Sequence, residues 1–249
     1  MQSVIPAEEK EVTYTEFLPS EALRSFIYCY WELKSPPRNT PFFYRVVADG
    51  CIDLFFEYNN PQMSSLMGYC NTYVEIPIMG AFHYVGVRFL PSAFPLLFGQ
   101  DAFEISAQEI PLREVVPALA TFIAQQLGAP LSLPATAQHL DGYFLRHLSQ
   151  LPLQIDNRFF SALSQILQSK GTIHISQLDT GISPRQLRRL FDYYIGDNPK
   201  TFSNIVRFQH ILSAKAYHNH SFLDTYYDQA HFIKSFKTFY GDTPSKVLG

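Results

Sequence analysis

Two similar segments, 45 residues apart, restrict the possible folds of the C-terminal part of the chain more than any other feature. Residues 183–199 read SPRQLRRLFDYYIGDNP and residues 228–244 read DQAHFIKSFKTFYGDTP. Each begins with a residue that can cap a helix N-terminus, Ser183 or Asp228, and continues with apolar residues at helical spacing. Each ends with a glycine suited to the left-handed position after a helix, then Asp, a polar residue and a Pro. The repeat predicts two similar helices, each followed by a turn and a new helix.

A longer helix is predicted to join the two repeated segments. After Pro199 one apolar stripe runs along the chain and extends at most to Tyr217. Its members are Phe202, Ile205, Val206, Ile211 and Leu212. A stripe of this kind is typical of a packed core, so we expect it to support the repeated helices and assign it no chemistry.

The N-terminal part of the chain has a different pattern. Between residues 18 and 90, aromatic and β-branched runs such as FYRVVADGCIDLFFEY and HYVGVRFL alternate with turn residues, which predicts an antiparallel sheet or barrel. The ADG at 48–50 predicts a hairpin turn. After Pro91 the apolar spacing becomes helical. We therefore predict an α+β chain in three parts. They are a β-rich sensor or assembly domain at 1–98, a helical connector at 99–154 and an all-α domain at 155–249.

The two ends of the chain differ in charge. Residues 1–154 contain 8 Lys and Arg against 15 Asp and Glu, a net charge of −7, whereas residues 155–249 contain 11 against 7, a net charge of +4. A basic helical unit is typical of proteins that bind polyanions. Because the sequence has neither a long uncharged apolar run nor the pattern of a secretion signal, we expect a cytoplasmic protein without membrane contact. The widely spaced Cys29, Cys51 and Cys70 are expected to be buried rather than to form disulfides or a zinc site.

The residues outside the apolar stripes of the two repeated helices are mostly cationic or carry amides. They are Arg185, Gln186, Arg188 and Arg189 in the first helix, and Gln229, Ala230, Ile233, Lys234 and Lys237 in the second. Arginine can pair with guanine and phosphate, and glutamine with adenine, so this set suits a helix in the major groove of DNA. A solvated helix face has a similar composition. The repetition around a connecting helix favours DNA contact.

These segments resemble the DNA-binding domain of the arabinose-operon regulator (AraC) family of bacterial transcription factors. The resemblance covers most of residues 170–249 and is carried by SPRQLRRLFDYYIGDNPKTF, VRFQHIL and YYDQAHFIKSFKTFYGDTPSKV. It implies two helix-turn-helix units joined by a long helix, and binding to double-stranded DNA. The N-terminal pieces LRSFIYCYWEL, YRVVADGCIDLFFEY and VGVRFLPSAFPLLFG resemble a sensor-like β domain that precedes such domains in one subgroup.

The resemblance also implies which residues contact DNA. Those at recognition positions are Arg185, Arg188 and Arg189 in the first unit, and Gln229, Ala230, His231 and Lys234 in the second. Lys200, Arg207 and Lys237 are expected to position the protein on phosphates. The implied function is sequence-specific regulation of transcription, controlled by a small-molecule effector or partner at the N-terminal domain. The helical connector is a candidate for homodimer formation.

A second function stays open because two segments are shorter than in that family. ISQLDTGIS and NHSFLDTYYD precede the repeated helices, where the family has the first helix of each helix-turn-helix unit. The alternative is a regulator-derived protein with remodelled helix-turn-helix units, which acts through protein–protein interaction rather than DNA binding.

The predicted β domain, which is cupin-like in this interpretation, offers a candidate ligand site. Arg45, Asp49, Asp53 and Arg88 are charged residues among aromatic ones, and in the mouth of a barrel they could orient a small ligand. The alternative is structural: Asp49 caps the turn and Arg88 pairs with an acid.

Catalytic and metal-dependent functions receive little support from the sequence. Asp228 and His231 share a helix face, but no Ser, Cys or third group completes a triad. The HNH at 218–220 has no Cys or acid at ligand spacing, and His83 is the sole histidine within residues 1–138. We therefore expect no enzyme activity, no cofactor and no metal.

Overall fold

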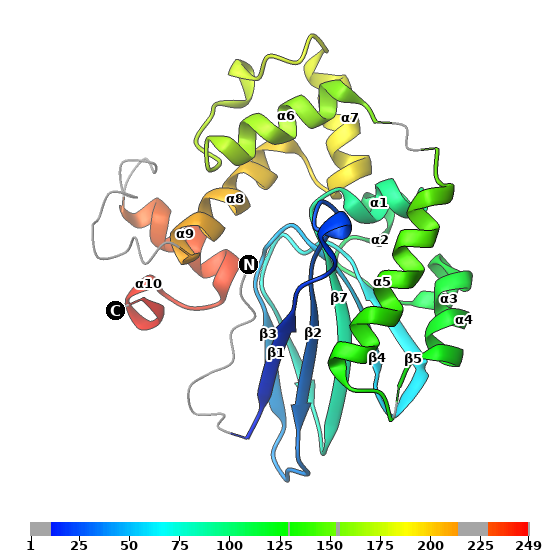
Figure 1. Cartoon of the computed structure of the whole chain (residues 1–249). Coiled ribbons are helices and arrows are strands. Elements are labelled where there is room, and N and C mark those ends of the chain that lie inside the picture. Colours follow the sequence, from blue (N-terminus) through cyan, green and yellow to red (C-terminus); the bar gives the residue numbers. More distant parts are fainter. Residues whose placement is uncertain (1–10, 129, 153–154, 214–228, 249) are drawn as a thin grey trace.

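The computed structural model of the chain describes residues 11–128, 130–152, 155–213 and 229–248 (Figure 1). The antiparallel strands lie within residues 13–111 and most of the helices follow them, so the predicted α+β class is confirmed. The strands are β1 (Thr13–Phe17), β2 (Ile27–Ser35), β3 (Phe42–Val46), β4 (Ile52–Glu57), β5 (Asn60–Met67), β6 (Val74–Ile78), β7 (Phe82–Phe89) and β8 (Glu109–Pro111). Six of them form one sheet in the order β1-β2-β7-β4-β5-β8, while β3 and β6 form a two-stranded sheet.

The hairpin predicted at 48–50 is wrong. β3 pairs with β6, and β4 pairs with β5 and β7, so the strands that flank this turn belong to different sheets. Gly50 has a φ of 79°, as a turn residue should, but the turn carries the chain from one sheet to the other. Val47 and Ala48 are buried in a core formed mainly by the C-terminal helices. Their burial explains why the chain crosses over here instead of folding back on β3.

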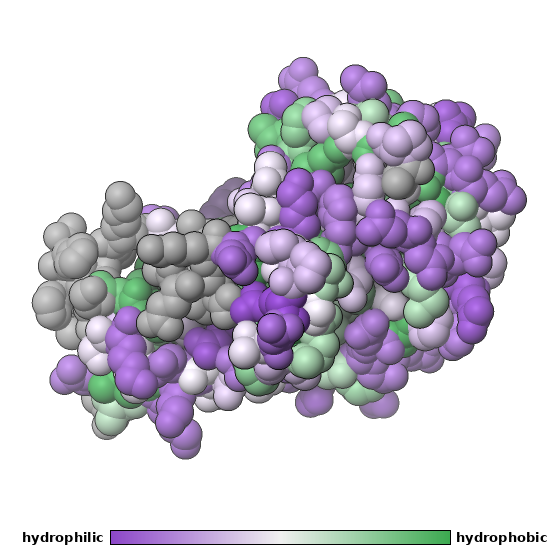
Figure 2. Space-filling model, turned by 90° about the horizontal axis from the view of Figure 1, so that it is seen from below, coloured by the Kyte–Doolittle hydropathy of each residue, from purple (hydrophilic) through white to green (hydrophobic). Residues whose placement is uncertain are grey.

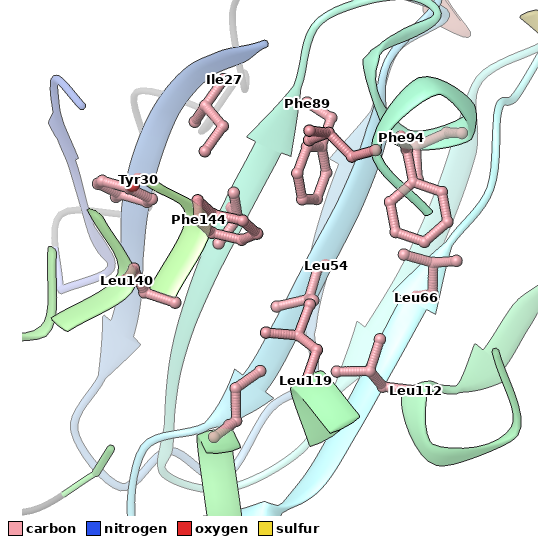
Figure 3. Close-up of a cluster of buried hydrophobic side chains, with 14 of the residues drawn as sticks. Ile27, Tyr30, Leu54, Leu66, Phe89, Phe94, Leu112, Leu119, Leu140 and Phe144 are labelled. Atoms are coloured by element: carbon pink, nitrogen blue, oxygen red, sulfur yellow. The ribbon is translucent and has the colours of Figure 1, made fainter. Parts of the chain in front are cut away.

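Helices cover one face of the six-stranded sheet. They are α1 (Ala93–Phe98), α2 (Ala102–Ile105), α3 (Leu112–Val115), α4 (Pro117–Gln126) and α5 (Leu133–Gln150). Figure 3 shows the core between the layers, where Tyr30, Leu54 and Phe89 of the sheet lie with Leu119 of α4 and Phe144 of α5. The helices predicted after Pro91 are thus confirmed. Burial of this apolar surface is the main term that holds helices and sheet together.

The opposite face of the sheet is covered by β3 and β6. Successive residues of β2 alternate between the two faces, as strand geometry requires. Tyr30 belongs to the core beneath the helices, whereas Trp31 and Leu33 pack with Phe42 and Tyr44 of β3. We call the two sheets with α1 to α5 the N-terminal unit.

The remaining helices form the C-terminal unit. They are α6 (Asn157–Gln168), α7 (Pro184–Ile195), α8 (Pro199–Ser213), α9 (Gln229–Tyr240) and α10 (Pro244–Val247), with a 3-10 turn, η2, at Ile175–Gln177. The repeated segments are α7 and α9, and α8 is the predicted connecting helix. Ser183 caps α7 with Gln186 in a reciprocal capping box. Gly196 and Gly241, with φ of 99° and 96°, follow the two repeated helices as predicted. The predicted cap Asp228 and the predicted limit Tyr217 lie outside the described residues.

The two units share a packed boundary. Val47, Ala48 and Tyr69 of the N-terminal unit belong to the core of the C-terminal helices. The Ala48 amide donates to the Phe239 carbonyl at 3.1 Å, and the Gln209 side-chain amide donates to the Ala48 carbonyl at 2.7 Å. The last residues of α7 pack on α2: a Cβ on Gly196 would lie 2.3 Å from Ser106 Oγ and 3.0 Å from the Ala102 carbonyl oxygen.

Replacing Gly196 by alanine is expected to lower the free energy of unfolding by about 2–5 kcal/mol. Left-handed backbone costs a residue with a Cβ about 1–2 kcal/mol, and crowding α2 adds about 1–3 kcal/mol. Gly181→Ala is a matched control, because Gly181 has a φ of 66° and open space around the position of a Cβ. Urea denaturation of both variants measures the difference. Equal losses would mean that α7 is not seated on α2 as described.

Several large hydrophobic side chains are exposed outside the cores, among them Leu18, Met63 and Met79. Seen from below, the molecule shows mainly hydrophilic side chains, with hydrophobic ones in separate patches (Figure 2). No helix within the described residues is both long and apolar enough to cross a membrane. Cys29, Cys51 and Cys70 are free and buried, as predicted, and burial raises the pKa of Cys29 to about 12. Such thiols remain protonated and unreactive near neutral pH.

Candidate functional site

The C-terminal unit contains a groove of about 890 Å³ that brings three of its helices together. Arg188 near the start of α7 and His231 near the start of α9 both line it. Between them, α8 contributes Lys200, Asn204 and Arg207. The two repeated helices therefore present polar groups to one groove, on either side of the helix that joins them.

The first turns of α7 expose all four of their predicted DNA-contacting residues. Arg185, Gln186, Arg188 and Arg189 are exposed. Leu187, Phe191 and Ile195 are buried on the other side of the helix and hold it in place. The Arg188 guanidinium lies 3.8 Å from Asp192 one turn later, in an exposed ion pair that contributes little to stability. Gln186 uses its side-chain carbonyl to cap the helix, and so is partly committed to local structure.

The start of α9 has the same arrangement. Gln229, Ala230, His231, Lys234 and Lys237 are exposed. Phe232 and Phe236 are buried, and Phe236 lies 5.4 Å from Phe208 of α8 between ring centroids. Ile233 is 38% exposed, so this side also presents an apolar contact. The two repeated segments thus expose polar side chains at similar positions of α7 and α9.

The three cations expected to position the protein on phosphates have different surroundings. Lys200 and Lys237 are exposed. Arg207 is half-buried and donates to the Gly171 carbonyl at 2.7 and 3.2 Å, so it holds the turn after α6. Asn204 is a groove residue that the sequence interpretation missed. Its place one turn after Lys200 on α8 was the available signal.

The C-terminal ends of α7 and α9 both face the N-terminal unit. Ser106 Oγ donates to the Gly196 carbonyl at 3.1 Å, and the Tyr73 amide donates to the Thr238 carbonyl at 3.2 Å. The first turns of both helices are therefore at the ends farther from the sheet (Figure 1). Helix N-termini carry partial positive charge, which adds to the attraction of these turns for anions.

The segment before α7 contains one short turn instead of a full helix. Between Thr172 and Ile182 the chain forms η2 alone, where His174 and Gln177 make a capping box. The corresponding segment before α9, and the HNH at 218–220, lie outside the described residues. The described segment before α7 therefore contains a single 3-10 turn and no full helix.

A second candidate site lies between the two sheets of the N-terminal unit. It is a cavity of about 280 Å³ with an aromatic wall. The rings come from Trp31 of β2, Tyr44 of β3, Phe55 of β4 and Tyr84 of β7. Asp53 of β4 and Glu109 of β8 supply carboxylates.

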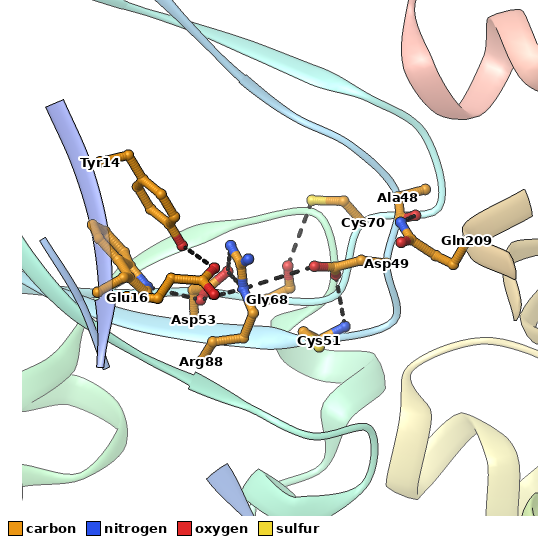
Figure 4. Close-up of polar contacts among 11 residues, drawn as sticks. Tyr14, Glu16, Ala48, Asp49, Cys51, Asp53, Gly68, Cys70, Arg88 and Gln209 are labelled. Carbon is orange, nitrogen blue, oxygen red and sulfur yellow. Dashed lines mark hydrogen bonds and ion pairs between the residues drawn. The ribbon is translucent and has the colours of Figure 1, made fainter. Parts of the chain in front are cut away.

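A buried ionic network lies behind this wall (Figure 4). Asp53 accepts hydrogen bonds from Arg88 Nε at 3.0 Å and from Trp31 Nε1 at 3.1 Å. Arg88 Nε is also 3.8 Å from Asp49, which accepts from the Cys51 amide at 2.9 Å. Burial raises the pKa of Asp49, against the lowering effect of the Arg88 charge. Burial lowers the pKa of Arg88, but the Asp53 and Asp49 charges outweigh it and raise this pKa well above its usual range.

The structure does not gather the four predicted ligand residues at one mouth. Of these, Asp53 lines the cavity. Arg88 and Asp49 have the structural roles of the alternative interpretation, an ion pair and a turn cap. Arg45 lies elsewhere, 2.6 Å from Glu75 and with its guanidinium 5.5 Å from the ring centre of Tyr240 in α9.

The histidine of β7, His83, has an acidic and an aromatic partner. His83 Nε2 lies 2.9 Å from Glu32, and its ring stacks on Tyr58. The part of the chain that the structure describes contains no group of three or more His, Cys, Asp or Glu residues placed to hold a metal ion.

The comparisons with known proteins concern the N-terminal unit. Residues 15–111 match a family described as "Domain of unknown function (DUF6597)". The matched segment extends from within β1 to the end of β8. No curated protein and no solved structure matches the chain. The match includes both sheets, the cavity and the Asp53–Arg88 pair, and ends before the C-terminal unit.

Proposed function

We propose that this chain regulates transcription by binding duplex DNA through the first turns of α7 and α9. The observation that carries the proposal is that Arg188 of α7 and His231 of α9 line the same groove over α8. Each of the two helices of matching sequence thus contributes a basic residue to one groove, and this arrangement is compatible with two neighbouring major-groove contacts.

Charge and sequence pattern support the same function. The C-terminal part carries a net charge of +4 in a chain whose total is −3, so positive charge is concentrated where the groove lies. In the proposed complex, Lys200 and Lys237 reach phosphates, while Arg185, Arg189 and Lys234 reach base edges or phosphates. The resemblance to AraC-type regulators, carried by the two repeated segments, supports duplex DNA as the polyanion.

Control by the N-terminal unit is part of the proposal. The ionic network beside the cavity continues into the turn at 47–51, because Asp49 pairs with Arg88 and caps this turn. Ala48 in the same turn bonds to Phe239 and Gln209 of the C-terminal unit. A ligand that displaces Asp53 or Arg88 would change how this turn packs on α8 and α9, and so shift the population that binds DNA.

Salt dependence of DNA binding tests the proposed function. A labelled duplex from the region upstream of the chain's own gene is titrated with the full chain at 50 and 200 mM salt. We expect the affinity to fall by roughly 10²- to 10³-fold, because about five phosphate contacts release counterions. A shuffled duplex of the same length is the control and should bind more weakly. If the folded protein leaves the DNA unbound at 50 mM salt, the proposal is wrong.

A second candidate function rests on the wall of the groove before α7. Four apolar residues before α7 line the groove: Ile173, Ile175, Leu178 and Ile182. The element in this part of the wall is the single 3-10 turn η2. Apolar groups at this point would suit a helix from another protein. In that case the chain retains no DNA at low salt, and the groove acts in protein–protein interaction.

A further inference from the structure

We propose that the cavity between the two sheets binds a small organic cation with an apolar or aromatic body, such as an arylalkyl amine. This inference deepens the effector part of the proposed function by naming the ligand class. Binding at the cavity itself does not require that the C-terminal unit binds DNA.

The wall of the cavity suits a cation because it is aromatic. Trp31, Tyr44, Phe55 and Tyr84 all line it. The ring centroids of Trp31 and Phe55 are 6.4 Å apart, and Phe55 and Tyr84 meet edge to face at 6.0 Å. Aromatic faces carry partial negative charge and attract ammonium groups, most strongly where water is excluded.

The charges at the cavity favour the same ligand. Among the described residues that line it, the ionisable acids are Asp53 and Glu109, and none is Lys, Arg or His. Arg88 stands behind Asp53 and is buried, so its charge is directed to the Asp53 and Asp49 carboxylates. A carboxylate ligand would meet two acids with no facing cation, whereas an ammonium group would meet both acids and the rings.

The remaining lining and the size define the body of the ligand. Leu33, Val46, Met67 and Ile76 provide apolar contacts. A volume of about 280 Å³ lies just below the roughly 300–1,000 Å³ typical of sites for drug-sized ligands. The cavity therefore suits a compact amine with one ring or a short apolar chain.

Trp31 gives a direct test, because it is the single tryptophan of the chain and lies in the cavity wall. Its emission is followed while the full chain is titrated with 2-phenylethylamine, 2-phenylethanol or phenylacetate at pH 7. These probes are similar in size and differ in charge. We expect a saturable change with the amine, at roughly tenfold higher affinity than with the alcohol, and none with the acid. Equal affinity for amine and alcohol, preference for the acid, or no saturable change with the amine would overturn the proposal.

Glu109→Gln separates charge from shape in this test. Glu109 is exposed on β8, so its replacement should leave the fold intact. We expect the variant to bind 2-phenylethylamine roughly threefold to tenfold more weakly and 2-phenylethanol unchanged. The control is Glu104→Gln on α2, an exposed acid outside the cavity lining. If both variants bind the amine like the wild type, Glu109 has no part in recognition and the assigned ligand class is wrong.

The two proposals fail in different ways. Loss of DNA binding with intact amine binding rejects the proposed function alone. Intact DNA binding without a Trp31 response to the amine rejects the ligand class alone. If the chain binds both DNA and the amine, but the amine leaves the affinity for DNA unchanged, then the cavity is a ligand site that is not coupled to α8 and α9.

Discussion

Replacing Arg88 by methionine is expected to lower the free energy of unfolding by about 3–5 kcal/mol, the usual cost of removing one partner of a buried ion pair. Arg88 is 2% exposed and its side chain donates to Asp53 at 3.0 Å with Asp49 3.8 Å away. Methionine fills part of the space but leaves two buried carboxyl groups without their cation. A loss of this size is a large part of the roughly 5–15 kcal/mol that stabilises a typical domain.

The pH dependence of this loss follows from the carboxyl groups. Burial already raises the pKa of Asp49 in the wild type. An acid whose pKa is raised by folding favours the folded state below its ordinary pKa, and this contribution is lost as pH rises through the folded value. Without Arg88 the pKa of Asp49 rises further. The deficit of the variant should therefore be smaller near pH 4 than at pH 7.

Urea denaturation at both pH values measures this prediction. Arg24→Met is the matched control, because Arg24 is exposed and the change should cost less than about 0.5 kcal/mol. The double variant Arg88→Met with Asp53→Asn should be less destabilised than the sum of the two single variants, since it removes both charges. Similar stability of the Arg88 and Arg24 variants would contradict the described network.

The second large effect concerns DNA affinity. Arg189→Ala and Lys234→Ala should each weaken binding to a cognate duplex by about 1–3 kcal/mol where the residue reads a base. Where it contacts phosphate, affinity falls for all sequences and the salt slope decreases by about one. The residues lie on separate helices, so their effects should add, and the double variant should lose about 2–6 kcal/mol.

A control variant separates a specific contact from loss of charge. Arg158→Ala removes a cation from α6, where the side chain is exposed, pairs with Asp156 at 2.7 Å and lies outside the groove. Its affinity for DNA should stay within about threefold of the wild type, as expected for a change of less than 1 kcal/mol. If Arg158→Ala weakens binding as much as Arg189→Ala, the protein binds DNA by its overall charge and α7 has no special role.

Local features of the fold could be predicted from the sequence. The caps and ends of α7 depend on residues within a few positions, such as Ser183 and Gly196, and these are read directly from the chain. The outward faces of α7 and α9 could also be predicted, because helical spacing separates Leu187 and Phe236 from the polar residues around them.

Features that depend on distant pairing could not be predicted. The residues at 48–50 predict a turn, and the structure has one there. The pairing of β3 with β6 depends instead on burial of Val47 and Ala48 against helices far along the chain. For the same reason the position of the cavity and most of its lining could not be predicted, although Asp53 was among the residues expected at a ligand site. Alternation in β2 places Trp31 and Leu33 on one face, but it does not show that β3 and β6 cover this face. Arg88 shows the same limit of sequence-based prediction. Its charge suggested a role in ligand binding, but the structure buries it beside Asp53 and Asp49, where it stabilises the fold.

The most direct test of the central claim, that α7 and α9 contact DNA from one side of the molecule, is a hydroxyl-radical footprint on a bound duplex. We expect two protected patches on one face of the DNA, about one helical turn or 10 base pairs apart. Arg189→Ala should weaken one patch and Lys234→Ala the other. A footprint that neither variant changes, or no protection at low salt by the folded chain, would contradict it.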